Sequence, residues 1–205
     1  MAKGSQKTII VNSRYSYILE HLDAVKALEA IYEETKIQVP KWVGGKLLTE
    51  IKKLFEEQKW SISFDNNYYE ISVFPKYRFD EKKDIGPYFG IEGFNWGCMN
   101  AEERDEAPWT YLWYRSPKKK THQFLSWEKK VHRVIDKERK KIERLGFEVK
   151  PFPDDKNYLI LHFLQKETNI KRLIDNPQKF IDASVNIFMD FFEKTKYLLE
   201  RFPKL

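Results

Sequence analysis

The spacing of apolar residues changes at Trp60, and this change constrains the fold more than any other feature of the sequence. From Trp60 onward apolar residues alternate with polar ones, as in residues 60–64 and 68–74, which is the period of a half-buried strand. Before Trp60 they recur at the period of an amphipathic helix, at Ile18, Leu22, Val25, Leu28 and Tyr32. The pattern therefore predicts helices that flank a β-sheet.

Two helices are expected before Trp60. The first follows a short strand over residues 8–11 and a cap at Asn12 or Ser13. Val39-Pro40 is expected to end it, because the residue before a proline is disfavoured in helical geometry. The second helix is expected from about Lys46 to Gln58.

Four strands are expected between residues 60 and 115, joined as an antiparallel meander. The first two are connected by Asp65-Asn66-Asn67, residues that tolerate the positive φ of a tight hairpin turn. The remaining two are residues 88–94 and 109–115. Later in the chain, residues 147–152 and 158–164 form a further predicted strand pair.

Three helices accompany that strand pair. The first runs from His122 to Leu145 and stops at Gly146; a short one follows around residues 167–174, and a long one opens with Asn176 as cap and Pro177 in its first turn. We therefore expect an α+β fold with an antiparallel sheet of about six strands and helices packed mainly on one face. The chain is expected to form a single domain, residues 1–205, with a helical portion (1–58), the meander (60–115) and a portion with the basic helix, strand pair and C-terminal helices (116–205).

Composition limits the class of protein. The chain of 205 residues is 41% hydrophobic and 16% aromatic, which is enough to build a core and too much for a disordered chain. Its longest apolar stretches are a few residues, whereas a helix that spans a bilayer needs roughly 20. The N-terminus lacks the apolar region of a signal peptide, and the single cysteine, Cys98, excludes an internal disulfide. We expect a cytoplasmic protein without membrane contact.

Positive charge is concentrated between Arg115 and Lys150. This block holds thirteen Lys or Arg against five Asp or Glu, a larger surplus than the +6 of the whole chain. Six of the cations fall on the arc of the predicted helix 122–145 opposite its apolar residues, and a lysine triplet precedes the helix. From residue 130 to residue 144 the row is about 21 Å long, enough to meet several phosphates. The predicted nucleic-acid-binding residues are Lys118, Lys119, Lys120, Lys130, Arg133, Lys137, Lys140, Lys141 and Arg144. The alternative interpretation is a solvated helix face, which is often rich in lysine.

Aromatic residues are concentrated in residues 109–115. Alternation places Trp109, Tyr111 and Trp113 on one face of this strand. Rings beside cations are typical of proteins that stack the bases of single-stranded nucleic acid. The alternative is that the row belongs to a core, since large aromatic side chains contribute much of the buried area of proteins.

One spacing is typical of a catalytic site. Glu148-Val-Lys150 matches the Glu-x-Lys element of metal-dependent nucleases, in which the carboxylate holds Mg²⁺ and the lysine steadies developing charge. Such a site needs a further acid on a neighbouring strand, and the nearest upstream acids are expected inside the helix. The four histidines show no metal-ligand spacing, and there is no glycine-rich phosphate loop. The sequence therefore predicts no catalytic residue, metal or cofactor.

The order of several segments resembles a known family. The series begins with a Trp-led strand (60–64), the segment Tyr88-Phe-Gly-Ile-Glu-Gly-Phe94 and an aromatic strand that ends in Trp-Tyr-Arg115. It continues with a helix, a strand pair and an Asn-Pro-x-x-Phe helix (176–180). Over roughly residues 45–200 this series is similar to the accessory C-terminal region of some PD-(D/E)XK-superfamily nucleases of bacteria and phages. The resemblance implies a role beside nucleic acid or in a defence system. The chain departs from those nucleases because it lacks their catalytic core.

These observations favour a non-enzymatic module that docks the phosphate backbone of nucleic acid on the basic helix, in a phage or bacterial defence context. One alternative is a protein-interaction module, an inhibitor or a subunit, that meets a charged partner through the acidic loop Glu102–Glu106 or through the basic helix. A second alternative is a small Mg²⁺-dependent nuclease that uses Glu148 and Lys150.

Overall fold

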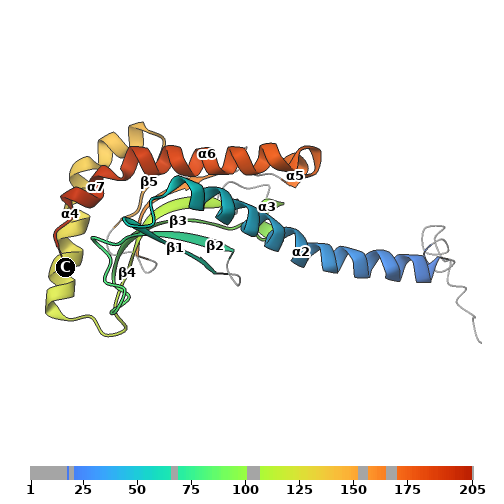
Figure 1. Cartoon of the computed structure of the whole chain (residues 1–205), viewed down its shortest axis with the longest axis horizontal. Coiled ribbons are helices and arrows are strands. Elements are labelled where there is room, and N and C mark those ends of the chain that lie inside the picture. Colours follow the sequence, from blue (N-terminus) through green and yellow to red (C-terminus); the bar gives the residue numbers. More distant parts are fainter. Residues whose placement is uncertain are drawn as a thin grey trace, which may run out of the picture. The chain divides into compact units, whose positions relative to one another are not determined.

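The computed structural model describes residue 18 and residues 21–65, 69–100, 107–151, 157–164 and 170–204 (Figure 1). The chain divides into two compact units, residues 1–38 and residues 39–205. The organisation of the whole chain as one domain stays a prediction. Several features predicted from the sequence lie wholly outside the described residues, namely the strand over residues 8–11, its following cap, the turn at Asn66-Asn67 and the acidic loop Glu102–Glu106. The predicted helix 167–174 and the predicted strands 68–74 and 147–152 lie partly outside them.

Six strands form one antiparallel sheet in the order β1-β2-β3-β4-β6-β5. The first four follow chain order, which confirms the predicted meander, and β6 then pairs with β4. The predicted strand 147–152 is shorter than expected, because only two of its residues pair with β6 at the sheet edge. The strands are Trp60–Asp65 (β1), Glu70–Pro75 (β2), Gly86–Glu92 (β3), Trp109–Arg115 (β4), Glu148–Val149 (β5) and Tyr158–Phe163 (β6).

Helices α4 and α6 begin at residues whose side chains cap them, and the cap of α6 is the predicted Asn176. Thr121 accepts a hydrogen bond from the backbone N–H of Phe124, and Asn176 accepts one from that of Lys179. Gly146 follows the basic helix with φ +83°, the left-handed geometry typical of a helix stop. The described helices are Leu22–Leu54 (α2), Trp96–Met99 (α3), His122–Arg144 (α4), Ile170–Asp175 (α5), Pro177–Thr195 (α6) and Tyr197–Arg201 (α7).

The predicted helix break at Pro40 is wrong. Helix α2 continues through Pro40 to Leu54, so the two helices expected before Trp60 are one. The proline removes one backbone hydrogen bond, but Pro40, Val43, Leu47 and Ile51 are all buried at helical spacing. Burial of this apolar face compensates for the lost bond. The boundary between the two compact units falls after residue 38, two residues before the proline.

The main core lies between one face of the sheet and the helices. Apolar side chains of α4, α6, α7 and the buried part of α2 share a single cluster with Ile71, Val73, Phe89, Leu112 and Ile160 of the sheet. In Figure 1, α6 and the second half of α2 cover one side of the sheet. The predicted α+β fold, with an antiparallel six-stranded sheet and helices packed mainly on one face, is confirmed.

The opposite face of the sheet carries a smaller aromatic cluster. Phe74, Phe79, Tyr88, Tyr111 and Leu161 are buried in it. The two tryptophans of β4 pack against it and are half-buried, whereas Tyr111 is fully buried. The aromatic row predicted in residues 109–115 is therefore a packed cluster on the face away from the helices, which agrees with the core interpretation.

In the unit of residues 1–38, the described part of α2 exposes much of its apolar stripe. The side chains of Leu28, Ile31 and Tyr32 are 66%, 60% and 50% exposed. None of the described helices is both long enough and apolar enough to cross a membrane.

Candidate nucleic-acid interface

Helix α4 separates its apolar and cationic residues cleanly. Its buried side chains, among them Phe124, Trp127, Val131 and Ile135, face the main core. The cations predicted to bind nucleic acid lie on the opposite side and are all exposed: Lys130, Arg133, Lys137, Lys140, Lys141 and Arg144. The sequence interpretation of this helix is thus matched by the burial of its residues.

The carboxylates of α4 are all engaged by other groups. Arg139 lies 2.8 Å from Asp136 and 3.7 Å from Glu143, so one guanidinium serves both exposed acids. Glu138 accepts a hydrogen bond of 3.0 Å from the Tyr197 hydroxyl and pairs with Arg201. The remaining acid, Glu128, is buried. These pairings use cations outside the predicted row.

Five cations of the predicted row are left without a carboxylate partner. Within the part of the chain that the structure describes, these side chains form no ion pair: Lys130, Arg133, Lys137, Lys140 and Arg144. At 100° per residue they share an arc of about 80°, and from first to last they span about 21 Å. We call these five residues the basic row. Lys141 is beside the row, with its ammonium 4.1 Å from the centre of the Tyr197 ring.

The lysine triplet before α4 is not uniform. Lys118 and Lys119 are exposed. Lys120 instead lies 2.7 Å from the carboxylate of Glu128, which is 3% exposed and also accepts a hydrogen bond of 2.7 Å from the Tyr114 hydroxyl. The sequence did not signal this difference, because the partner of Lys120 is eight residues away on an inward helix face.

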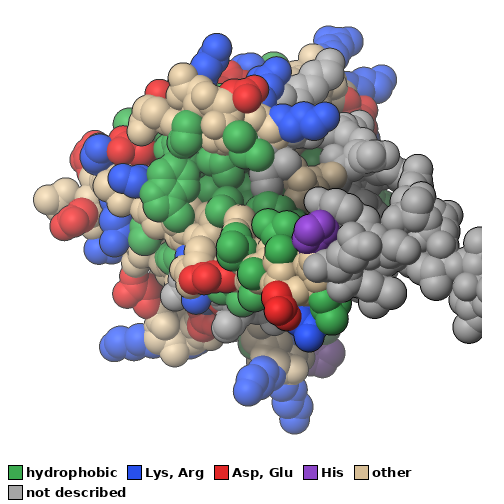
Figure 2. All heavy atoms as spheres, turned by 90° about the vertical axis from the view of Figure 1, so that its right-hand side faces the viewer, with side chains coloured by type: hydrophobic (Ala, Val, Ile, Leu, Met, Phe, Trp, Pro, Cys, Tyr) green, Lys and Arg blue, Asp and Glu red, His purple; other side chains and the backbone are tan. Residues whose placement is uncertain are grey.

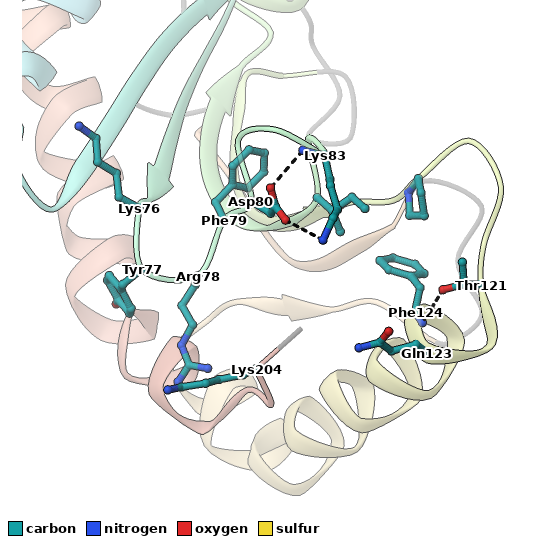
Figure 3. A pocket seen from close by; sticks show the side chains of 12 residues that line it. Lys76, Tyr77, Arg78, Phe79, Asp80, Lys83, Thr121, Gln123, Phe124 and Lys204 are labelled. Atoms are coloured by element: carbon teal, nitrogen blue, oxygen red, sulfur yellow. Dashed lines mark hydrogen bonds and ion pairs between the residues drawn. The ribbon is translucent and has the colours of Figure 1, made fainter.

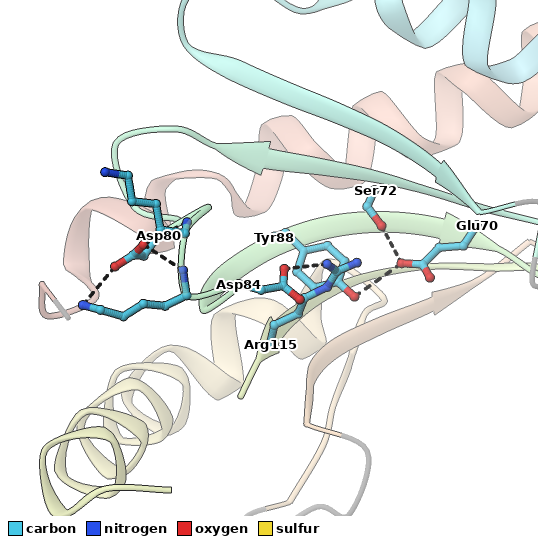
Figure 4. Close-up of polar contacts among 8 residues, drawn as sticks. Glu70, Ser72, Asp80, Asp84, Tyr88 and Arg115 are labelled. Carbon is cyan, nitrogen blue, oxygen red and sulfur yellow. Dashed lines mark hydrogen bonds and ion pairs between the residues drawn. The ribbon is translucent and has the colours of Figure 1, made fainter. Parts of the chain in front are cut away.

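A second carboxylate, the half-buried Glu70, is hydrogen-bonded on the sheet face away from the helices. Glu70 accepts hydrogen bonds from the hydroxyl of Ser72 at 2.5 Å and from that of Tyr88 at 3.3 Å (Figure 4). It also accepts one from the hydroxyl of Tyr111 at 2.5 Å. Burial raises the pKa of Tyr111 and of Tyr88 well above 10. Both phenols therefore remain protonated donors at neutral pH. Arg115 pairs with Asp84 at 2.7 Å beside these side chains.

The predicted nuclease element gains no support from its surroundings. Lys150 lies 2.6 Å from the carboxylate of Glu148, so the two residues neutralise each other. Among the residues that the structure describes, no group of three or more His, Cys, Asp or Glu side chains could hold a metal ion. Of the histidines, His132 is buried 3.4 Å from the Tyr114 hydroxyl and His162 packs on Phe147, as expected of residues in a core.

One face of the molecule carries a mixture of cations and anions. In the face shown in Figure 2, Lys and Arg side chains are interspersed with Asp and Glu. Against this background the unpaired alignment of the basic row is distinctive.

A comparison with family models, curated proteins and solved structures finds no match. The resemblance to the accessory region of PD-(D/E)XK-superfamily nucleases accordingly stays a hypothesis.

Proposed function

We propose that this protein binds nucleic acid by docking the phosphate backbone on the basic row of α4, without catalysis. The observation that supports it is that five aligned, exposed cations form no ion pair with any described residue, whereas every carboxylate of the same helix is engaged. Aligned charges of one sign repel one another, and a polyanion relieves that repulsion with release of its counterions.

A merely solvated helix face would show a different arrangement. On α2 and α6, lysines commonly pair with a carboxylate three or four residues earlier, as Lys36 does with Glu33, Lys53 with Glu50 and Lys194 with Asp190. The exposed lysines of α2 without such a partner among the described residues are at least five residues apart and form no continuous row: Lys26, Lys41, Lys46 and Lys52. The basic row departs from both patterns.

A setting in phage or bacterial defence belongs to the same proposal and rests on the sequence resemblance described above. The exposed pair Lys118 and Lys119 is a second point of backbone contact in this proposal. Lys120 is excluded from it, because its charge is neutralised by Glu128.

The test is fluorescence anisotropy with labelled duplex and single-stranded DNA and RNA at 50 and 200 mM salt. Five phosphate contacts predict a loss of affinity of roughly 10²- to 10³-fold between these salt concentrations. Replacement of Lys130, Lys137 and Lys140 by Glu should remove most of the binding and lower the salt slope by about one unit per lysine.

The matched control replaces Lys41, Lys46 and Lys52 of α2 by Glu, which changes the net charge equally away from α4. It should retain most of the affinity. Equal losses in both triple variants would reduce the effect to net charge and overturn the basic row as the site. No binding of any nucleic acid at 50 mM salt would overturn the function itself and favour a charged protein partner.

A further inference from the structure

A second group of cations surrounds a cleft at the N-terminal end of α4. The cleft has a volume of about 760 Å³ and lies between the β2–β3 connection, the first turn of α4 and Lys204 (Figure 3). This volume is in the range of pockets that hold small organic ligands. The sequence interpretation missed it, because its walls come from three separate parts of the chain, residues 76–85, residues 117–124 and Lys204.

The lining is strongly cationic. Four cationic side chains line the cleft, Lys76, Arg78, Lys83 and Lys204, against one carboxylate, Asp80. Asp80 is already engaged: its carboxylate lies 3.1 Å from the Lys83 ammonium and accepts the backbone N–H groups of Lys82 and Lys83, both at 3.1 Å. The hydrogen bond from Lys83 lowers the pKa of Asp80, so this group remains ionised and neutralises only one of the four cations.

Arg78 is held in place without being neutralised. Its guanidinium donates to the backbone carbonyls of Phe202 at 3.0 Å and Glu200 at 3.2 Å. These carbonyls fix the orientation of the guanidinium but carry no net charge, and three of its five N–H donors remain available. Among the described residues, neither Arg78 nor the lysines at 76 and 204 forms an ion pair. A positioned guanidinium of this kind suits a phosphate group.

The cleft also has apolar side chains and one amide in its lining. Phe79, beside Asp80 on the β2–β3 connection, and Phe124 of α4 line the cleft and are almost fully buried, and Gln123 lies next to Phe124 (Figure 3). An occupant therefore meets both cations and apolar side chains. This combination fits a phosphorylated organic molecule better than an inorganic ion.

We propose that this cleft binds the phosphate monoester of an organic ligand of nucleotide size. The same chemistry is offered by a free nucleotide and by the 5′-phosphate at the end of a nucleic-acid strand. The proposal does not depend on the basic row, because the residues of the cleft and those of the row are different.

The test is isothermal titration calorimetry of the full chain with AMP, with adenosine, and with two short single-stranded oligonucleotides that differ only in a 5′-phosphate. Binding of AMP but not of adenosine identifies a free nucleotide as a ligand. A 5′-phosphate that strengthens oligonucleotide binding at least tenfold identifies a strand end. Either result supports the cleft, provided that Lys204→Glu weakens that binding at least tenfold.

Two further variants make the test specific. Lys46→Glu, an exposed change on α2, should leave the affinity unchanged. Arg78→Gln should weaken binding as Lys204→Glu does, but it also removes two contacts with the C-terminal segment, so its melting temperature is measured alongside. Absence of phosphate-dependent binding at ligand concentrations up to about 1 mM overturns the proposal. A Kd of about 1 mM corresponds to a binding free energy of about −4 kcal/mol. Phosphate-dependent binding that Lys204→Glu leaves intact overturns it as well.

Discussion

The ring of Tyr111 on β4 lies across Gly90 of β3, so close that a Cβ on Gly90 would be 2.2 Å from the ring. Its hydroxyl then reaches Glu70 of β2 at 2.5 Å. Gly90 pairs with Tyr111 on one side and with Ser72 on the other, so this side chain connects three neighbouring strands. It does so on the sheet face that carries no helix of the main core.

Replacement of Gly90 by Ala should destabilise the fold by about 1–3 kcal/mol, because the new methyl group displaces the Tyr111 ring. Chemical denaturation measures the change. Gly45→Ala is the matched control: a Cβ there meets no atom within 4 Å, and alanine favours a helix interior by about 0.5–1 kcal/mol. Equal stability of the two variants would contradict the close approach of Tyr111.

Tyr111 and Tyr88 should make the protein sensitive to alkaline pH. Burial raises both pKa values above the ordinary value of 10.0. The folded state therefore binds these protons more tightly than the unfolded state. Their contribution to stability is present in full below pH 10 and is lost as the pH rises from there toward the raised pKa values.

The measurement is urea denaturation at several pH values between about 8.5 and 11, which lie on both sides of the ordinary tyrosine pKa of about 10. Tyr111→Phe should reduce the decline of the unfolding free energy above pH 10 by about 1.4 kcal/mol per pH unit. Tyr32→Phe, at a tyrosine that is 50% exposed, is the control and should leave the decline unchanged. An identical pH dependence of the Tyr111→Phe variant and the wild type would refute the buried, protonated phenol.

The three lysines before α4 should differ in their effect on stability. Lys120→Met leaves the buried carboxylate of Glu128 without its cation and should lower the free energy of unfolding by roughly 1–2 kcal/mol. The loss is smaller than for a fully buried ion pair, because the Lys120 side chain is 38% exposed and solvent screens its charge. Lys118→Met and Lys119→Met should stay within about 0.5 kcal/mol of the wild type. Thermal unfolding compares the three, and a uniform response would show that Lys120 has no structural role.

Removal of one negative charge beside the basic row should strengthen nucleic-acid binding. Asp136 is exposed and pairs with Arg139. Asp136→Asn should tighten binding a few-fold at 50 mM salt and less at 200 mM, since salt screens exposed charges. Asp190→Asn on α6 makes the same charge change at an exposed ion pair elsewhere and should have little effect. Equal gains in both variants would speak against docking on α4.

The elements that the sequence predicted well have strong local signals. The cap at Asn176 and the stop at Gly146 are properties of a few adjacent residues, and the meander follows from alternation between residues 60 and 115. The break at Pro40 failed because a local preference was outweighed by burial of Val43 and Leu47, which depends on residues far along the chain. The loss of one hydrogen bond is smaller than the gain from a buried apolar face.

The sequence alone determined that α4 has opposite apolar and cationic faces, because an α-helix converts spacing into direction. Only the tertiary structure decided which cations are neutralised. Lys120 meets a carboxylate eight residues away, Arg139 serves two acids of its own helix, and Arg78 meets carbonyls more than 120 residues away. Charge is a property of each side chain, whereas its compensation depends on distance in space, which a linear pattern does not contain.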